Sequence, residues 1–243
     1  MRHVAVILVL AALAHSAKLP SNFLKCNRKQ PDLKECVLKA TRDAVPKMIR
    51  PYKEVNLPSL YPLEIPSATL YGGSGTIALD QHYKNCKIFG FERPDIKQFE
   101  FDFEKKTLTV AIFYPELQQN CDYMMDGKIL LLDIKGEGPS VITLANNTVD
   151  CLLKYEEVKK NGKTYMHFVD SKLKMEPEKV TFRFDNLFNG DKALGDNINA
   201  VLNDNSKEVF DDMKEAYVET VNQILIGLIN RFFGKLSIEE AFD

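Results

Sequence analysis

The sequence is poor in the side chains that most catalytic and metal sites use. It has four histidines, and two of them, His3 and His15, lie in an N-terminal segment that we expect to be removed. Only His82 and His167 would then remain, although most general-base and nucleophile-activation schemes depend on histidine. The sequence also has no C-x-x-C motif and no Cys/His cluster at zinc-ligand spacing. We therefore expect no catalytic residue, no metal site and no cofactor.

The sequence also has no excess of positively charged residues. The chain has 32 Lys and Arg residues against 34 Asp and Glu residues, a formal net charge of −2. Nucleic-acid-binding domains are usually strongly basic, so we expect no nucleic-acid partner. Beyond the N-terminal segment, no apolar run approaches the roughly 20 residues that a membrane-spanning helix needs. We therefore expect no stable membrane insertion.

The sequence does have a hydrophobic N-terminus. Residues 1–17 read MRHVAVILVLAALAHSA, in which Arg2 precedes the apolar run Val4–Ala14 and small residues follow. This order is typical of a secretory signal peptide with cleavage after Ala14 or Ala17, and the run is too short to anchor the chain across a bilayer. We predict a signal peptide at residues 1–17, a single domain at residues 18–243, and a secreted, extracellular protein.

The cysteine content agrees with secretion. Five cysteines in a secreted chain indicate disulfides, and the odd number leaves at least one cysteine unpaired within the chain. Cys26 and Cys36 are near neighbours, and we expect them to form a bridge. The other three cysteines, Cys86, Cys121 and Cys151, are scattered among strand-like segments. They are either three buried thiols, or two of them form a further bridge and the third is a thiol. We expect these three to be mostly reduced and buried.

A glycosylation sequon is present at Asn146-Asn147-Thr148. It lies in an apparent turn between strand-like segments. Asn146 is therefore a candidate site for an N-linked glycan.

The middle of the chain has the pattern of a β-sheet. A short helix is predicted after Asp32, ending or bending at Pro46. From Thr76 to about Leu187 apolar and polar residues alternate, most clearly in Phe99–Glu104, so one face of each strand is buried. Turn-forming residues divide this region, and together they predict a long antiparallel meander. They are Asp126-Gly127, Gly136–Pro139, Asn146-Asn147 and Asn161-Gly162.

After Asn189-Gly190 the period becomes helical. The pattern predicts a short helix ending near Asn203 and a second helix from Asn205 or Ser206 to Phe233, with Gly234 as its stop. Towards its end the second helix is apolar nearly all round, which indicates enclosure by protein. The predicted fold is α+β, with a long antiparallel sheet wrapped around the long C-terminal helix.

Several blocks of the sequence resemble the insect takeout and juvenile-hormone-binding protein family, and the resemblance runs from Lys18 to the C-terminus. It implies a strongly curved antiparallel sheet wrapped around a long C-terminal helix and enclosing an apolar tunnel. It also implies a secreted, non-enzymatic carrier of a small hydrophobic ligand, such as a juvenile-hormone-like terpenoid, a fatty acid or another lipid. The blocks are Leu19-Pro20-Ser21, Cys26 with Cys36, Asp126–Leu132, Lys160–Tyr165 and, most specifically, Asp185–Asp196.

The resemblance also bears on the disulfides. It assigns the family's first bridge to Cys26–Cys36. Dedicated hormone carriers of the family have a second bridge to the C-terminal helix, but no cysteine follows Cys151 here. The sequence is therefore more similar to the takeout-like branch, whose ligands are less defined.

A carrier needs a lined cavity, and strand alternation together with the helix stripe nominates the lining. Specificity would come from one or two polar groups in an apolar tube, with Tyr123 and Tyr155 as candidates. Each position is equally explained as ordinary core. The expected lining residues are Ile77, Leu79, Ile88, Phe99, Phe101, Val110, Ile112, Tyr123, Leu153, Phe168, Phe182, Phe184, Val221, Ile224 and Leu228.

Two other functions remain open. The chain could be a secreted signalling or interaction protein that binds an unknown protein receptor through its outer surface, with a tunnel that is only structural. An esterase would rest on Ser74 alone, in Gly72-Gly73-Ser74-Gly75-Thr76, which departs from the nucleophile elbow at Thr76 and precedes a strand. A flexible turn explains those glycines better.

Overall fold

The computed structural model describes residues 17–71, 77–129 and 132–243. The predicted signal peptide, apart from Ala17, and the segment around Ser74 lie outside the described residues. Three short helical segments come first: α1 (Leu33–Ala44), η1 (Val45–Ile49) and η2 (Lys53–Val55). The strands are β1 (Leu63–Leu70), β2 (Ile77–Phe89), β3 (Asp95–Asp102), β4 (Thr107–Ile129), β5 (Leu132–Lys160) and β6 (Lys163–Phe184). The chain ends with η3 (Phe188–Gly190), α2 (Lys192–Asp204), α3 (Ser206–Phe233) and α4 (Ile238–Phe242).

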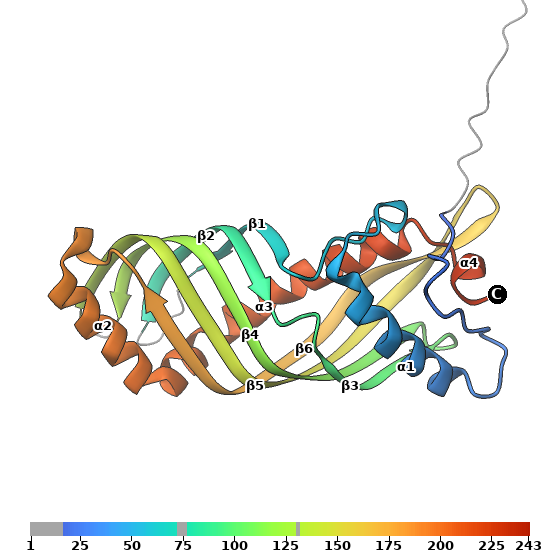
Figure 1. Ribbon diagram of the computed structural model, residues 1–243, viewed down its shortest axis with the longest axis horizontal. Helices are drawn as coiled ribbons and strands as arrows, with labels where there is room; N and C mark the ends of the chain where they lie inside the picture. Colours follow the sequence, from blue (N-terminus) through green and yellow to red (C-terminus); the bar gives the residue numbers. More distant parts are fainter. Residues whose placement is uncertain (1–16, 72–76, 130–131) are drawn as a thin grey trace, which may run out of the picture.

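All strand pairs are antiparallel, and the sheet wraps around α3 (Figure 1). The strand order is β1-β2-β4-β5-β6, and β3 pairs with the first half of β4. Helix α2 lies at one end of the elongated molecule, and α1 and α4 lie at the other (Figure 1). The predicted α+β class, the curved sheet and the long C-terminal helix are confirmed. Among the described helices, none combines the length and the hydropathy needed to cross a bilayer.

Three of the four predicted turns were wrong, because they lie inside long strands. Asp126-Gly127 belongs to β4, whereas Gly136–Pro139 and Asn146-Asn147 belong to β5, which has 29 residues. Asn146 has a φ of 49° and is skipped in the pairing on both sides, but the register is the same before and after it, so β5 continues through this position. Its side chain is exposed, and its amide donates to Glu178 Oε2 at 2.5 Å. Asn161-Gly162 does form the predicted hairpin turn, between β5 and β6.

The cysteine prediction needs one correction. Cys26–Cys36 is bridged, as expected, and Cys151 is free and buried. Cys86 and Cys121, however, form a second bridge. They lie on the paired strands β2 and β4 beside a register shift between Lys84 and Lys87, which brings their Cα atoms to 4.1 Å. Strand alternation alone cannot reveal such a pair, because it depends on the register between distant segments.

The free edge of the sheet at β6 is covered by three asparagines from the C-terminal helices. Asn199 and Asn203 of α2 each accept from a β6 backbone N–H and donate to the carbonyl of the same residue, Phe184 and Phe182 respectively. Asn230 of α3 makes the same pair of bonds with Phe168, at 2.7 and 2.8 Å. The side-chain amide thus replaces a neighbouring strand and fixes each helix to the sheet.

We expect Asn230→Ala to lower the free energy of unfolding by about 1–3 kcal/mol, because it leaves both backbone groups of buried Phe168 without a partner. Urea denaturation measures the change. Asn205→Ala is the matched control, since Asn205 is exposed and, among the described residues, its side chain donates only to Val201 O in the preceding helix. The control should change stability by about 0.5 kcal/mol or less. Equal effects of both variants would contradict a clamping role for Asn230.

Candidate ligand-binding cavity

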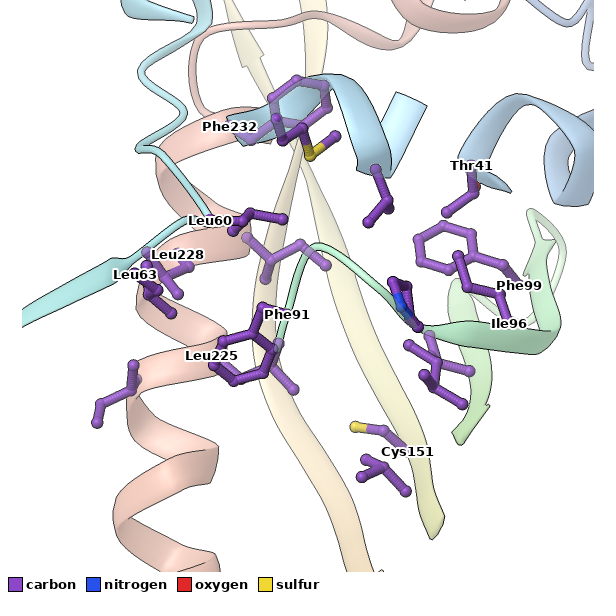
Figure 2. A pocket seen from close by; sticks show the side chains of 18 of the residues that line it. Thr41, Leu60, Leu63, Phe91, Ile96, Phe99, Cys151, Leu225, Leu228 and Phe232 are labelled. Atoms are coloured by element: carbon purple, nitrogen blue, oxygen red, sulfur yellow. The ribbon is translucent and has the colours of Figure 1, made fainter. Parts of the chain in front are cut away.

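An internal cavity of about 450 Å³ lies between α3 and the concave face of the sheet (Figure 2). Strands β1 to β6 supply one side, and α3 supplies the opposite side with a stripe that includes Val221, Leu225 and Leu228. The part of the chain that precedes β1 covers the space between them through Leu24, Ala40 and other apolar residues. The volume is within the range that suits a small organic ligand.

Among the residues that the structure describes, no charged side chain lines this cavity. Its polar lining is limited to hydroxyl and amide groups, and the rest is aliphatic, aromatic or sulfur-containing. A buried charge without a partner is very costly, whereas a hydroxyl or amide can accept one hydrogen bond from a neutral guest at small cost. The lining therefore suits an uncharged molecule. The polar members are Thr41, Tyr83, Tyr114, Gln119, Tyr217 and Thr220.

Two tyrosine hydroxyls stand out among these polar groups. Tyr217 on α3 faces Gln119 on β4, with 3.5 Å between Tyr217 Oη and Gln119 Oε1. Tyr114 on β4 packs edge-on against Phe91, and its hydroxyl has no hydrogen-bond partner among the described residues. Burial raises the pKa of Tyr217 to about 12 and also raises the pKa of Tyr114. Both phenols therefore stay protonated at physiological pH and can donate a hydrogen bond.

We expect Tyr114→Phe to weaken binding of an oxygen-containing ligand by roughly threefold to tenfold, since it removes one hydrogen bond worth about 0.5–1.5 kcal/mol. Affinity for a hydrocarbon of similar size should not fall. Isothermal titration with a matched alcohol and alkane measures both values. An equal loss for the two compounds would show that Tyr114 contributes only shape.

The structure places nine of the fifteen nominated residues on the cavity wall. They come from β2, β3, β4, β5 and α3, so elements far apart in the sequence meet at one space. Phe101 is 7% exposed and lies on the inner face, so the predicted register of β3 is confirmed. The nine are Ile88, Phe99, Phe101, Val110, Ile112, Leu153, Val221, Ile224 and Leu228.

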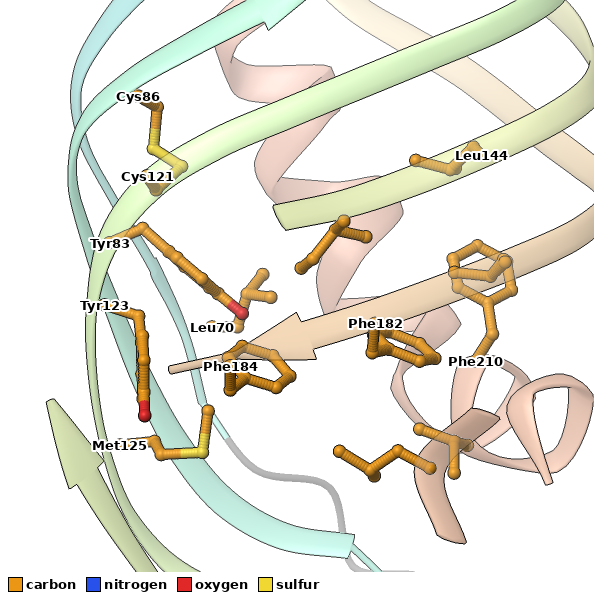
Figure 3. Packing of buried hydrophobic residues seen from close by; sticks show 14 of the residues in the cluster. Leu70, Tyr83, Cys86, Cys121, Tyr123, Met125, Leu144, Phe182, Phe184 and Phe210 are labelled. Atoms are coloured by element: carbon orange, nitrogen blue, oxygen red, sulfur yellow. A yellow bond between two sulfur atoms is a disulfide. The ribbon is translucent and has the colours of Figure 1, made fainter. Parts of the chain in front are cut away.

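Five nominated residues lie elsewhere, and the sixth, Ile77, has its side chain outside the described part of the chain. Leu79, Phe182 and Phe184 pack at the α2 end, where they surround a small separate void. Figure 3 shows Phe182 and Phe184 on β6. Tyr123 donates its hydroxyl to Asp185 O at 2.7 Å, and Phe168 packs against Phe233. Alternation identified the inner face correctly, but α2 fills one end of it, so inward-facing residues there are core.

Tyr155 is also outside the cavity wall. Its ring packs against Phe168 at a centroid distance of 5.5 Å, and its buried hydroxyl has no hydrogen-bond partner in the described part of the chain. Tyr155 belongs to the buried cluster that includes Phe168 and Phe233, and it is not one of the polar groups that a guest would meet.

Residues between Ala17 and β1 also line the cavity, a contribution that was not predicted from the sequence. Val37, Ala40 and Thr41 of α1 line the cavity together with Met48 of η1. The sequence predicted a short helix after Asp32. It did not indicate that this helix would close a cavity, because that depends on where α1 packs.

An uncharged cavity between a curved antiparallel sheet and a long helix is the architecture of a protein that binds apolar small molecules. The family model described as "Haemolymph juvenile hormone binding protein (JHBP)" matches residues 4–243 of the chain. The chain belongs to this family.

Similar proteins agree with this assignment. The circadian clock-controlled protein daywake of Drosophila melanogaster is 28% identical over 137 residues, 56% of this chain and 53% of the relative. Daywake of Drosophila yakuba is 26% identical over 149 residues, 60% of this chain and 57% of the relative. The chain thus spans about half the length of these relatives. The crystal structure of Epiphyas postvittana Takeout 1 superposes with a TM-score of 0.76 at 24% identity and covers 90% of this chain and 99% of that one, which shows the shared fold.

Proposed function

We propose that the protein is a secreted, non-enzymatic carrier that holds one small hydrophobic ligand in the cavity beside α3. The observation that carries the proposal is the cavity beside α3, whose lining among the described residues has no charged side chain. The family assignment, the signal-peptide pattern and the two bridges support it. Burying about 400 Å² of ligand surface would contribute about 10 kcal/mol before association costs, so tight binding needs no covalent chemistry.

The ligand is neutral. An ionised carboxylate inside this cavity would find no Lys, Arg or His on the described part of the wall, and only neutral donors such as Tyr114 and Tyr217. Neutral donors compensate a buried charge poorly. An ester, ketone, alcohol or hydrocarbon avoids that cost, so terpenoid esters and similar lipids fit better than free fatty acids.

We expect the methyl ester of a long-chain fatty acid to bind at least tenfold more tightly than the acid at pH 7.4. The carboxyl group must be neutralised on binding, so the affinity of the acid should rise as the pH falls towards its pKa, while that of the ester should stay constant. Displacement of a fluorescent lipid probe measures both. Equal affinities at pH 7.4 would contradict a neutral ligand.

Native mass spectrometry and solvent extraction of the purified secreted protein test the carrier function itself. A co-purifying neutral lipid, displaced by the probe, is the expected result. Absence of any extractable lipid together with absence of probe binding would refute the carrier and favour the alternative, a signalling protein that acts on a receptor through its outer surface.

A further inference from the structure

The charge of the chain is divided unevenly between two parts. Residues 18–61, here called the N-terminal cap, contain ten Lys and Arg residues against four Asp and Glu residues, a formal charge of +6. Residues 62–243 contain 21 against 30, a formal charge of −9. The near-neutral total therefore conceals a basic cap on an acidic body. The cap comprises α1, η1, η2 and the segments that join them.

Much of this positive charge is available to a partner. Arg28, Lys34 and Lys47 are engaged in ion pairs with Asp243, Glu100 and Asp43. Arg50 and Lys53 are exposed, and in the described part of the chain neither forms an ion pair. They flank the turn between η1 and η2, next to exposed Ile49.

Exposed apolar side chains lie in the same cap. Leu24, Ile49 and Tyr61 are 42%, 49% and 52% exposed. Ser59 joins two of them, because its hydroxyl donates to Ile49 O at 3.0 Å and accepts from Tyr61 N at 3.0 Å.

The third exposed residue, Leu24, is held beside the same segment by its neighbours. Phe23 packs on Tyr52 with ring centroids 4.7 Å apart, and Lys47 Nζ donates to Asn22 O at 2.7 Å. Leu24 also connects this surface with the cavity. Among the lining side chains in the described ranges, it is the one that is exposed to solvent. The cavity therefore approaches the surface at the place where basic and apolar residues are combined.

We propose that the N-terminal cap docks on an anionic lipid bilayer and brings the mouth of the cavity to the membrane surface. Basic side chains attract anionic headgroups, while a few exposed apolar side chains enter the headgroup boundary, which gives reversible peripheral binding. A sparingly soluble ligand could then pass between bilayer and cavity without crossing water. The acidic body is repelled by the same headgroups, which orients the cap towards them.

Vesicle co-sedimentation of the full mature protein, with no added ligand, tests the proposal. We expect at least tenfold more binding to phosphatidylcholine vesicles containing phosphatidylglycerol than to pure phosphatidylcholine vesicles, with loss of binding at high salt. Arg50→Glu/Lys53→Glu and, separately, Ile49→Glu should each reduce binding at least fivefold. Leu194→Glu is the matched control, because Leu194 is 48% exposed but lies on α2 at the opposite end (Figure 1). It should leave binding unchanged.

Several results would overturn the proposal. One is that the protein binds neither kind of vesicle, and another is that it binds both equally. A third is that Ile49→Glu and Leu194→Glu reduce vesicle binding by the same factor. The proposal would also be overturned if the cap bound an acidic protein but did not bind anionic vesicles. Failure of the carrier function would leave these measurements unaffected, since they need no occupied cavity. Thermal denaturation of each variant checks that the variant is folded.

Discussion

Ala68→Phe should weaken ligand binding at least tenfold while the protein remains folded. Ala68 lies on β1, and its side chain faces the cavity opposite α3. A phenyl group at this position occupies space that the ligand needs, and tenfold corresponds to about 1.4 kcal/mol. Because the added ring is apolar and enters an existing space, it should cause little strain. Probe titration measures the affinity, and the thermal midpoint reports the stability.

The neighbouring position provides the control. Ser67 is exposed on the same strand, so Ser67→Phe adds a ring of the same size outside the cavity. Its affinity should equal that of the unmodified protein. If Ala68→Phe bound the probe normally and retained its thermal midpoint, the ligand would have to lie elsewhere in the molecule.

Replacing Cys86 and Cys121 together by alanine should lower the free energy of unfolding by about 4 kcal/mol in the chain-entropy model, because this bridge closes a loop with a separation of 35 residues. The Cys26–Cys36 bridge closes a separation of 10 residues, and its removal should cost about 3 kcal/mol. Chemical denaturation of the two double variants measures both values. A smaller loss for the Cys86–Cys121 variant would contradict the ranking.

Thiol counting checks the pairing on which this ranking depends. One free thiol per chain is expected after denaturation without reductant, and it belongs to Cys151. Before denaturation the same thiol should react slowly, because burial raises its pKa to about 11 and little thiolate exists at neutral pH. Three free thiols would mean that Cys86 and Cys121 are not joined.

The helices and the faces of the strands could be predicted from the sequence because they depend on local periodicity. Helix α3 ends at Phe233 before Gly234, as its pattern indicated, and Phe101 is buried as the alternation in Phe99–Glu104 required. The turns could not be predicted in the same way. Asparagine and glycine occur both in hairpin turns and, as at Asn146 here, inside a continuous strand, and only the partner strands distinguish the two.

The cavity was harder to predict than the fold. Leu228 and Phe182 both have the pattern of inward-facing residues, yet Leu228 lines the cavity whereas Phe182 packs at the α2 end. The difference depends on where α2 packs along a 22-residue strand, which no local pattern records. The same limit hid the contribution of α1 and the polar groups Tyr114 and Tyr217, which become neighbours of the cavity only in the folded sheet.

The asparagine clamps on β6 also bear on how molecules of this protein meet one another. A bare strand invites the strand of another molecule to add to the sheet, and repeated addition builds fibres. Asn199, Asn203 and Asn230 occupy the backbone groups on which such growth would begin, and exposed Pro66 interrupts β1 on the other side. Loss of the clamps would therefore expose a template for polymerisation, so these asparagines protect solubility as well as the attachment of the helices.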